Sequence, residues 1–170
     1  VPSGDTGDYC RARSKLDVTV LRGLTAQAAR HLEESGAPSW LWHGLHPKLV
    51  DGFTFTMPDT IDNQEAFPQQ KSQRPGAGFP IARACAILSL TTAAIHDLAL
   101  GPYEGKETGE TALLWGLMDQ LAAGDVVVAD RAFAGYFGIA RLRQRGIDLL
   151  IRQHQCRHTD FRRGRRLGKR

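Results

Sequence analysis

The apolar positions in the second half of the chain follow two spacings, one typical of helices and one typical of strands. Residues 108–121 place leucines at 113, 114, 117 and 121, which predicts a helix that Thr108 is expected to cap. The β-branched run DVVVAD at 125–130 predicts a strand buried on both faces. Residues 133–145 again have helical spacing, and IDLLI at 147–151 predicts another buried strand. This alternation predicts parallel strands joined by right-handed crossovers.

The first half of the chain predicts one amphipathic helix and three strands. The helix covers residues 16–34 and ends before a glycine and a proline. Apolar and polar residues alternate over 48–57, which predicts a strand. Residues 81–90 and 93–100 predict two further strands, although their alanines also allow a helix. The expected fold is therefore α/β, with a mixed sheet of about five strands.

Two segments show neither the helical nor the strand spacing of apolar residues. Residues 1–12 are rich in glycine and aspartate and are expected to be irregular. Residues 59–80 are polar, with several glutamines and prolines, and predict a long loop. Loops of this length inside a domain are often functional or mobile.

The net charge of +4 conceals a strong asymmetry along the 170 residues. Residues 152–170 hold eight basic residues and one acidic residue, or +7. The other 151 residues hold 14 basic and 17 acidic residues, or −3. A basic block of this kind indicates contact with a polyanion or a solvated tail, and composition alone favours neither.

The three cysteines, Cys10, Cys85 and Cys156, are far apart and odd in number. They argue against a secreted disulfide framework and fit a reducing compartment. The first residues are polar and acidic, unlike a signal peptide. The apolar stretch 81–100 is interrupted by charged residues, so it does not predict a membrane span. We therefore expect a cytoplasmic protein that makes no contact with a membrane.

Two aspartates on predicted strands carry the most chemical information. Asp51 lies in the strand 48–57, and Asp130 ends the strand 125–130. Ligand sites of open α/β sheets gather at the carboxyl ends of parallel strands, so neighbouring strands would bring both carboxylates together. Such a pair suits Mg²⁺, and two ions can stabilise both oxygens of a phosphoryl displacement. The alternative is that each aspartate only starts a loop or caps a helix, and the pattern leaves both open.

The basic block also allows more than one interpretation. Its arginines could bind DNA phosphates, and its interleaved Phe161 and histidines could stack on bases. His154, Cys156 and His158 alternate, but three ligands without a fourth make a weak zinc signal.

Several motifs of this chain resemble the IS4-type transposases of bacterial insertion sequences, which belong to the DDE group with an RNase H-like fold. The resemblance covers about residues 40–170 and rests on five segments in the same order. They are VDGFTFTMPDT, PGAGFPIAR, LGPYEGKETGE, VVVADRAFAGYF and IRQHQCRHTDFRRGRRLGK.

The resemblance implies a catalytic and metal-ligating role for Asp51, followed by Gly52, and for Asp130, followed by Arg131, Ala132 and Tyr136. It implies two Mg²⁺ or Mn²⁺ ions in the complete site, and DNA as the partner, both element ends and target. The full-length protein is expected to form a homodimer and to be nucleoid-associated when bound to DNA. The residues expected to contact DNA are Arg131, Arg152, His154, Arg157, Arg162, Arg163, Arg165 and Arg166.

The family's third acid is a glutamate in a Tyr–Arg–Glu–Lys signature downstream of the second aspartate. No glutamate occurs between Asp130 and Arg170, so the chain is expected to be a truncated fragment, inactive alone. The implied organisation is an N-terminal helical segment at 1–39, a partial catalytic core at 40–152 and the start of a basic insertion at 153–170.

Three functions follow as hypotheses. The first is a transposase that cuts a phosphodiester at the element end and transfers the strand to target DNA. The second is a non-catalytic DNA-binding remnant that lacks the third acid. The third is a phosphatase of the haloacid-dehalogenase type, which is disfavoured because the position two residues after Asp51 is Phe53 rather than an aspartate.

Overall fold

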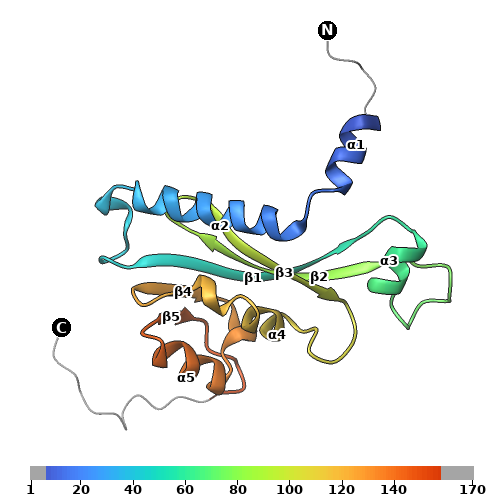
Figure 1. The fold of residues 1–170 in the computed structure, drawn as a ribbon. Coiled ribbons are helices and arrows are strands. Elements are labelled where there is room, and N and C mark those ends of the chain that lie inside the picture. Colours follow the sequence, from blue (N-terminus) through green and yellow to red (C-terminus); the bar gives the residue numbers. More distant parts are fainter. Residues whose placement is uncertain (1–6, 158–170) are drawn as a thin grey trace.

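A computed structural model describes residues 7–157 of the chain as five strands, five α-helices and three short 3-10 helices (Figure 1). The strands are β1 His46–Thr56, β2 Ile81–Ser89, β3 Ile95–Pro102, β4 Asp125–Ala129 and β5 Asp148–Ile151. The α-helices are α1 Gly7–Ser14, α2 Val18–Glu34, α3 Ile61–Ala66, α4 Glu110–Trp115 and α5 Tyr136–Gln144. The 3-10 helices are η1 Pro38–Trp40, η2 Met118–Gln120 and η3 Arg131–Phe133.

The five strands form one mixed sheet in the order β3-β2-β1-β4-β5. β1, β2 and β3 are antiparallel neighbours, whereas β4 is parallel to both β1 and β5. This confirms the predicted α/β sheet, and its topology is consistent with an RNase H-like domain. The segments 81–90 and 93–100 form a hairpin, as the strand interpretation predicted, and the helical alternative is wrong.

The hydrophobic core lies between the sheet and the helices that follow β3 and β4. Apolar side chains of β1, β2 and β4 meet those of α4, η2, η3 and α5 there, which buries them almost completely. The contributing residues include Val50, Cys85, Ile87, Val127, Leu114, Leu117, Met118, Phe133 and Leu142. Burial of this apolar surface is the main force that holds the crossover helices on the sheet.

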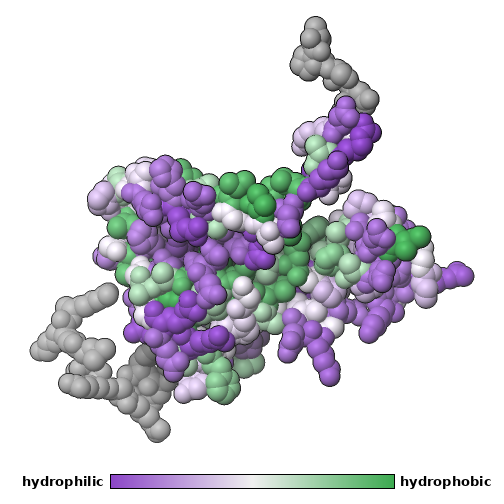
Figure 2. Space-filling view, in the orientation of Figure 1, coloured by the Kyte–Doolittle hydropathy of each residue, from purple (hydrophilic) through white to green (hydrophobic). Residues whose placement is uncertain are grey.

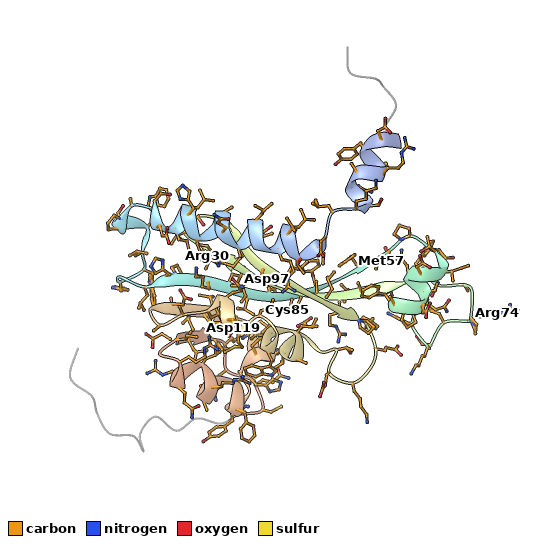
Figure 3. All side chains as sticks on the ribbon, in the orientation of Figure 1. Arg30, Met57, Arg74, Cys85, Asp97 and Asp119 are labelled. Carbon is orange, nitrogen blue, oxygen red and sulfur yellow. The ribbon has the colours of Figure 1, made fainter. Side chains whose placement is uncertain are left out.

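Helix α2 is fixed to the sheet by two small residues and two ion pairs. Ala26 and Ala29 are buried, which lets the helix approach the strands closely. Arg22 pairs with Asp97 of β3 through Nη2 and Oδ2 at 2.6 Å, and Glu33 pairs with Lys48 of β1. Figure 3 shows Asp97 and Arg30 in the space between α2 and the strands.

Lys48 is the centre of a buried cluster of charged side chains. Its side chain is only 2% exposed, and its Nζ lies 2.9 Å from Nε2 of His96 and 4.0 Å from Oδ1 of Asp125. Burial lowers the pKa of His96, and the charge of Lys48 lowers it further. Burial alone would raise the pKa of Glu33, but hydrogen bonds from Lys48 and Ser89 outweigh it and lower that pKa.

The segment between β1 and β2 is more ordered than a long polar loop. It contains α3, which begins at a cap where Thr60 Oγ1 accepts from the Asn63 N–H. Gln69 Oε1 accepts hydrogen bonds from the backbone N–H groups of Gly76 and Gly78. Side-chain amides therefore organise this end of the hairpin, whose tip carries Arg74 (Figure 3).

The helices differ from their predicted bounds. α4 ends at Trp115 because the chain turns into the 3-10 helix η2, and its N-cap is Gly109 rather than Thr108. α5 begins at Tyr136 because η3 occupies the preceding residues. Residues 7–12, expected to be irregular, form most of α1, which stands away from the sheet in Figure 1.

Hydrophobic side chains also reach the surface. Figure 2 shows them along the outer side of α2, where Val18, Val20, Leu21 and Leu24 are exposed. Over residues 7–157, no helix is long and apolar enough to cross a membrane.

Candidate functional site

Asp51 and Asp130 each follow the last paired position of two neighbouring parallel strands, Asp51 within β1 and Asp130 directly after β4. Val50 of β1 is paired with Ala129 of β4, and each aspartate is the next residue along its own strand. Because the strands are parallel, both chains leave this last pair in the same direction. The fold therefore brings together the two acids that the sequence singled out.

Each aspartate makes one local hydrogen bond and is exposed to solvent. Oδ1 of Asp51 accepts from the N–H of Gly52 at 2.9 Å. Oδ1 of Asp130 accepts from the N–H of Ala132 at 2.8 Å, which caps η3. Asp130 therefore caps a helix, which is the alternative role that the sequence pattern allowed for it. Its other carboxylate oxygen has no partner within residues 7–157. Both side chains can still receive a ligand.

The edge of β1 is open at this position. β4 ends at Ala129, whereas β1 continues to Thr56 with only β2 beside it. Side chains alternate between the two faces of a strand, so Asp51 leaves β1 on the face opposite to buried Val50. That second face is more open, since Phe53 and Phe55 on it are 49% and 37% exposed. A ligand at this edge is accessible from solvent.

Glu110, the first residue of α4, approaches β1 from the packed face. A Cβ built on Gly52 would lie 2.7 Å from Oε1 of Glu110, and closer still to its carboxyl carbon. A larger residue at position 52 would require the flexible side chain of Glu110 to move. The contact between Glu110 and Gly52 was not predicted from the sequence, because it depends on the packing of α4 against β1.

Cys85 of β2 lies directly opposite Gly52 in the antiparallel register. Burial raises the pKa of its thiol to about 12, and the negative charges of Glu110 and Asp51 contribute to that shift. Cys85 is therefore a core residue whose thiol stays protonated at neutral pH. Figure 3 places it near the centre of the sheet.

The donor chemistry of the acid pair fits a hard divalent cation. Carboxylate oxygens are the protein ligands of Mg²⁺ sites, which often use one or two carboxylates together with waters and phosphate oxygens. In the part of the chain that the structure describes, no group of three or more His, Cys, Asp or Glu side chains is arranged to hold a metal ion. The structure therefore offers a pair of acids rather than a closed metal cage.

The predicted DNA-contacting residues are only partly described. Arg131 follows Asp130 and donates from Nη1 to Oε1 of Gln155 at 2.8 Å, so the segment after β5 passes close to the acid pair. Arg152 and Arg157 are exposed, and Nδ1 of half-buried His154 accepts from the N–H of Cys156. The remaining residues lie outside the described range: Arg162, Arg163, Arg165 and Arg166, as well as His158 of the weak zinc pattern.

Comparison with known proteins places this chain in a family. A model of the transposase DDE domain matches residues 45–170, and the chain therefore belongs to that family. No solved structure matches the chain.

One relative supports the IS4 group specifically. The transposase InsG for insertion sequence element IS4 of Escherichia coli (strain K12) is 26% identical over 132 residues. The match covers 78% of this chain and 28% of that relative. The predicted resemblance to IS4-type DDE transposases is confirmed, and the chain spans little more than a quarter of the relative that it matches.

Proposed function

We propose that this chain supplies the first two acids of a transposase active site, which binds the ends of an insertion sequence and cuts and transfers DNA strands. Asp51 and Asp130 hold divalent cations, Mg²⁺ or Mn²⁺, with two ions in the complete site. The observation that carries this proposal is the adjacency of the two aspartates beyond the Val50–Ala129 pair. Neither aspartate is buried in an ion pair that would occupy it.

The protein's own groups position the DNA rather than form a covalent bond with it. Asp51 and Asp130 would hold the divalent cations, which would supply activation of the attacking water and charge stabilisation at the entering and leaving oxygens. Asp51 and Asp130 fix where the reaction occurs, because both follow rigid, paired strand positions. Reaction at a phosphodiester also requires that the DNA backbone be held close to this edge.

Basic residues beside the acid pair provide that hold. Arg131 directly follows Asp130, and Arg152 follows β5, which is the next parallel strand. Their exposed guanidinium groups suit phosphate contacts, which give orientation rather than base recognition. His154 and Arg157, and the arginines at 162, 163, 165 and 166, extend this basic surface in our proposal.

The division of the chain follows from this function. We propose that residues 1–39 form an N-terminal helical segment, 40–152 a partial RNase H-like core and 153–170 the start of a basic DNA-contacting segment. In a full-length protein, two copies pair two element ends as a homodimer, and the protein works in the bacterial cytoplasm, at the nucleoid.

The proposal is tested by metal-dependent nicking of insertion-sequence ends by a full-length relative. Substitution to alanine at either position corresponding to Asp51 and Asp130 should abolish nicking in Mg²⁺ and in Mn²⁺. An exposed acid of the hairpin loop, the position of Glu65, provides the matched control and should keep full activity. Nicking that survives both aspartate substitutions would refute the assignment.

A second candidate is DNA binding without cleavage. It is favoured by one observation, the exposed side chains of Arg131 and Arg152 beside the acid pair, which suit phosphate contacts without any metal. The two candidates separate when the 170-residue chain is incubated with element-end DNA and Mg²⁺. A shifted but intact DNA band supports the binding function, whereas a metal-dependent nick supports catalysis by this chain.

A further inference from the structure

We propose that Phe53 and Phe55 form a platform on which unpaired DNA bases stack, beside the phosphodiester on which the acid pair acts. The inference rests on the proposed function, because it names the form of DNA that this site takes. It assigns a role to two exposed side chains that the acid pair itself does not use.

The two phenylalanines share one face of β1 with Asp51. Side chains alternate along a strand, so positions 51, 53 and 55 leave β1 on the same side, about 7 Å from one to the next. Figure 1 shows this end of β1 extending past β4 toward α3, with β2 as its neighbour. A DNA strand that follows β1 away from Asp51 therefore passes over both phenylalanines.

The two rings lie side by side and are open to solvent. Their centroids are 6.0 Å apart, and their planes are inclined by 34°. Their cross-strand partners on β2 are Ala84 and Ala82, which are fully buried. Because alanine is small, no bulky side chain of β2 stands beside the rings, and about half of Phe53 and a third of Phe55 remain exposed.

The apolar surface continues toward the edge of the sheet. Leu100 of β3 pairs with Ala84 and is half exposed. Helix α2 packs mainly against β3 rather than against β1. Single exposed apolar residues are common, but neighbouring ones on one face of a sheet indicate a binding surface.

The groups around this surface favour a nucleic acid as its occupant. Arg131 and Arg152 are exposed after β4 and β5, and their guanidinium groups suit phosphates. Proteins that hold single strands combine such cations with aromatic rings on which successive bases stack. The bases must be unpaired, because a duplex keeps their faces stacked on one another. Every base has such a face, so the platform would hold a strand without reading its sequence.

The simpler role for Phe53 and Phe55 is structural. Aromatic residues are favoured in strands whatever covers them, and a second copy of the chain is another occupant that would hide them from water. Neither role requires the bases of DNA. A comparison of DNA with and without bases therefore separates stacking from both alternatives.

The experiment is fluorescence anisotropy of a labelled, short, single-stranded oligodeoxythymidine titrated with the 170-residue chain at several salt concentrations. The variants are Phe53→Leu and Phe55→Leu, with Tyr9→Leu as the matched control from the exposed side of α1. Each phenylalanine variant should weaken binding by about 5-fold, the lower end of the range for lost stacking, because leucine keeps an apolar contact. The factor should be the same at every salt concentration, since stacking releases no counterions. Tyr9→Leu should bind like the unmodified chain.

An abasic oligomer of the same length keeps the phosphates and lacks the bases. It should bind the unmodified chain and both phenylalanine variants equally, because it has nothing to stack. If the variants weaken its binding as much as they weaken binding of the oligodeoxythymidine, the rings do not contact bases and the inference is overturned.

The remaining outcomes separate this inference from the proposed function. Salt-dependent DNA binding that neither phenylalanine variant changes would overturn the platform and leave the proposed function intact. No binding of single-stranded or duplex DNA by the unmodified chain would overturn both. If sedimentation shows that the variants lose a dimer while DNA affinity stays the same, the occupant is a second copy and the platform is overturned. Circular dichroism establishes that each variant is folded; if one is not, the other decides.

Discussion

Asp51 and Asp130 are separated by 78 residues in the sequence, yet each directly follows one member of the Val50–Ala129 pair. Parallel pairing of β1 with β4 produces this adjacency, and α4 and η2 provide the crossover that makes the pairing possible. The acids thus occupy the edge of the sheet where ligands of α/β proteins commonly bind.

The buried ion pair between Lys48 and Glu33 should contribute strongly to stability. Lys48→Met removes the cation and leaves Glu33, whose side chain is 12% exposed, next to the sheet without its partner. We expect the free energy of unfolding to fall by about 3–5 kcal/mol, as for broken buried pairs. Chemical denaturation measures this change.

The matched control for that prediction is Arg11→Met. Arg11 pairs with Asp8 on α1, where both side chains are largely exposed. Water screens such pairs, so we expect a change of about 0–1 kcal/mol at most. If the two substitutions lower the free energy of unfolding equally, the buried ion pair of Lys48 stabilises the protein no more than an exposed pair does.

The same cluster predicts loss of stability in acid. Burial and the charge of Lys48 lower the pKa of His96 in the folded state. His96 therefore takes up a proton at a higher pH in the unfolded chain than in the folded chain, and stability is lost as the pH falls below about 6.5. Folding also lowers the pKa of Glu33, so more stability is lost as the pH falls below 4.5, the ordinary pKa of a glutamate. Asp125 opposes these losses, because burial raises its pKa. The melting temperature should therefore decrease from pH 7 to pH 5 in the native chain and decrease less in His96→Gln.

His31→Gln is the control for the acid prediction, because His31 lies on the exposed side of α2. It should show the same decrease between pH 7 and pH 5 as the unmodified chain. If His96→Gln and His31→Gln have identical pH profiles, His96 is not responsible for the acid sensitivity.

DNA binding by this chain should depend strongly on salt. A plot of the logarithm of the affinity for duplex DNA against the logarithm of the salt concentration has a slope of about −0.9 for each phosphate that a cationic side chain contacts. The double variant Arg152→Ala/Arg157→Ala should therefore flatten the slope by about 2 units. Fluorescence anisotropy with labelled duplex at several salt concentrations measures it.

Lys71→Ala/Arg74→Ala removes the same charge from the tip of the β1–β2 hairpin and should leave the slope unchanged. A native affinity that does not vary with salt would count against both the transposase and the DNA-binding hypotheses. If the slope changes only in the hairpin variant, the DNA binds at the hairpin end of the sheet instead.

Sequence periodicity predicted the strands well because each has a clear local pattern. The β-branched run of β4 and the alternation of β1 identify buried and half-buried strands without reference to the rest of the fold. The motifs around Asp51 and Asp130 identified the candidate acids. Strand order and register, which bring these acids together, depend on contacts between distant segments and did not follow from local pattern.

Three features escaped prediction for physical reasons. The alternating pattern of β1 gives no sign that Lys48 is buried, because the partners that compensate its charge come from α2, β3 and β4. The leucine spacing at 108–121 continues through a helix end, so α4 was predicted too long. The position of Glu110 against Gly52 arises only when α4 packs on β1.

The most direct test of the proposed acid pair is the location of a bound metal. Crystals of the chain grown with Mn²⁺ would show each ion as a peak in the anomalous difference map. We expect a peak at the open edge of β1, with oxygens of Asp51 and Asp130 as ligands at about 2.1 Å, the distance typical of small divalent cations. A folded structure with Mn²⁺ elsewhere, for example at Asp125 or Asp119, and none between these two aspartates would contradict it.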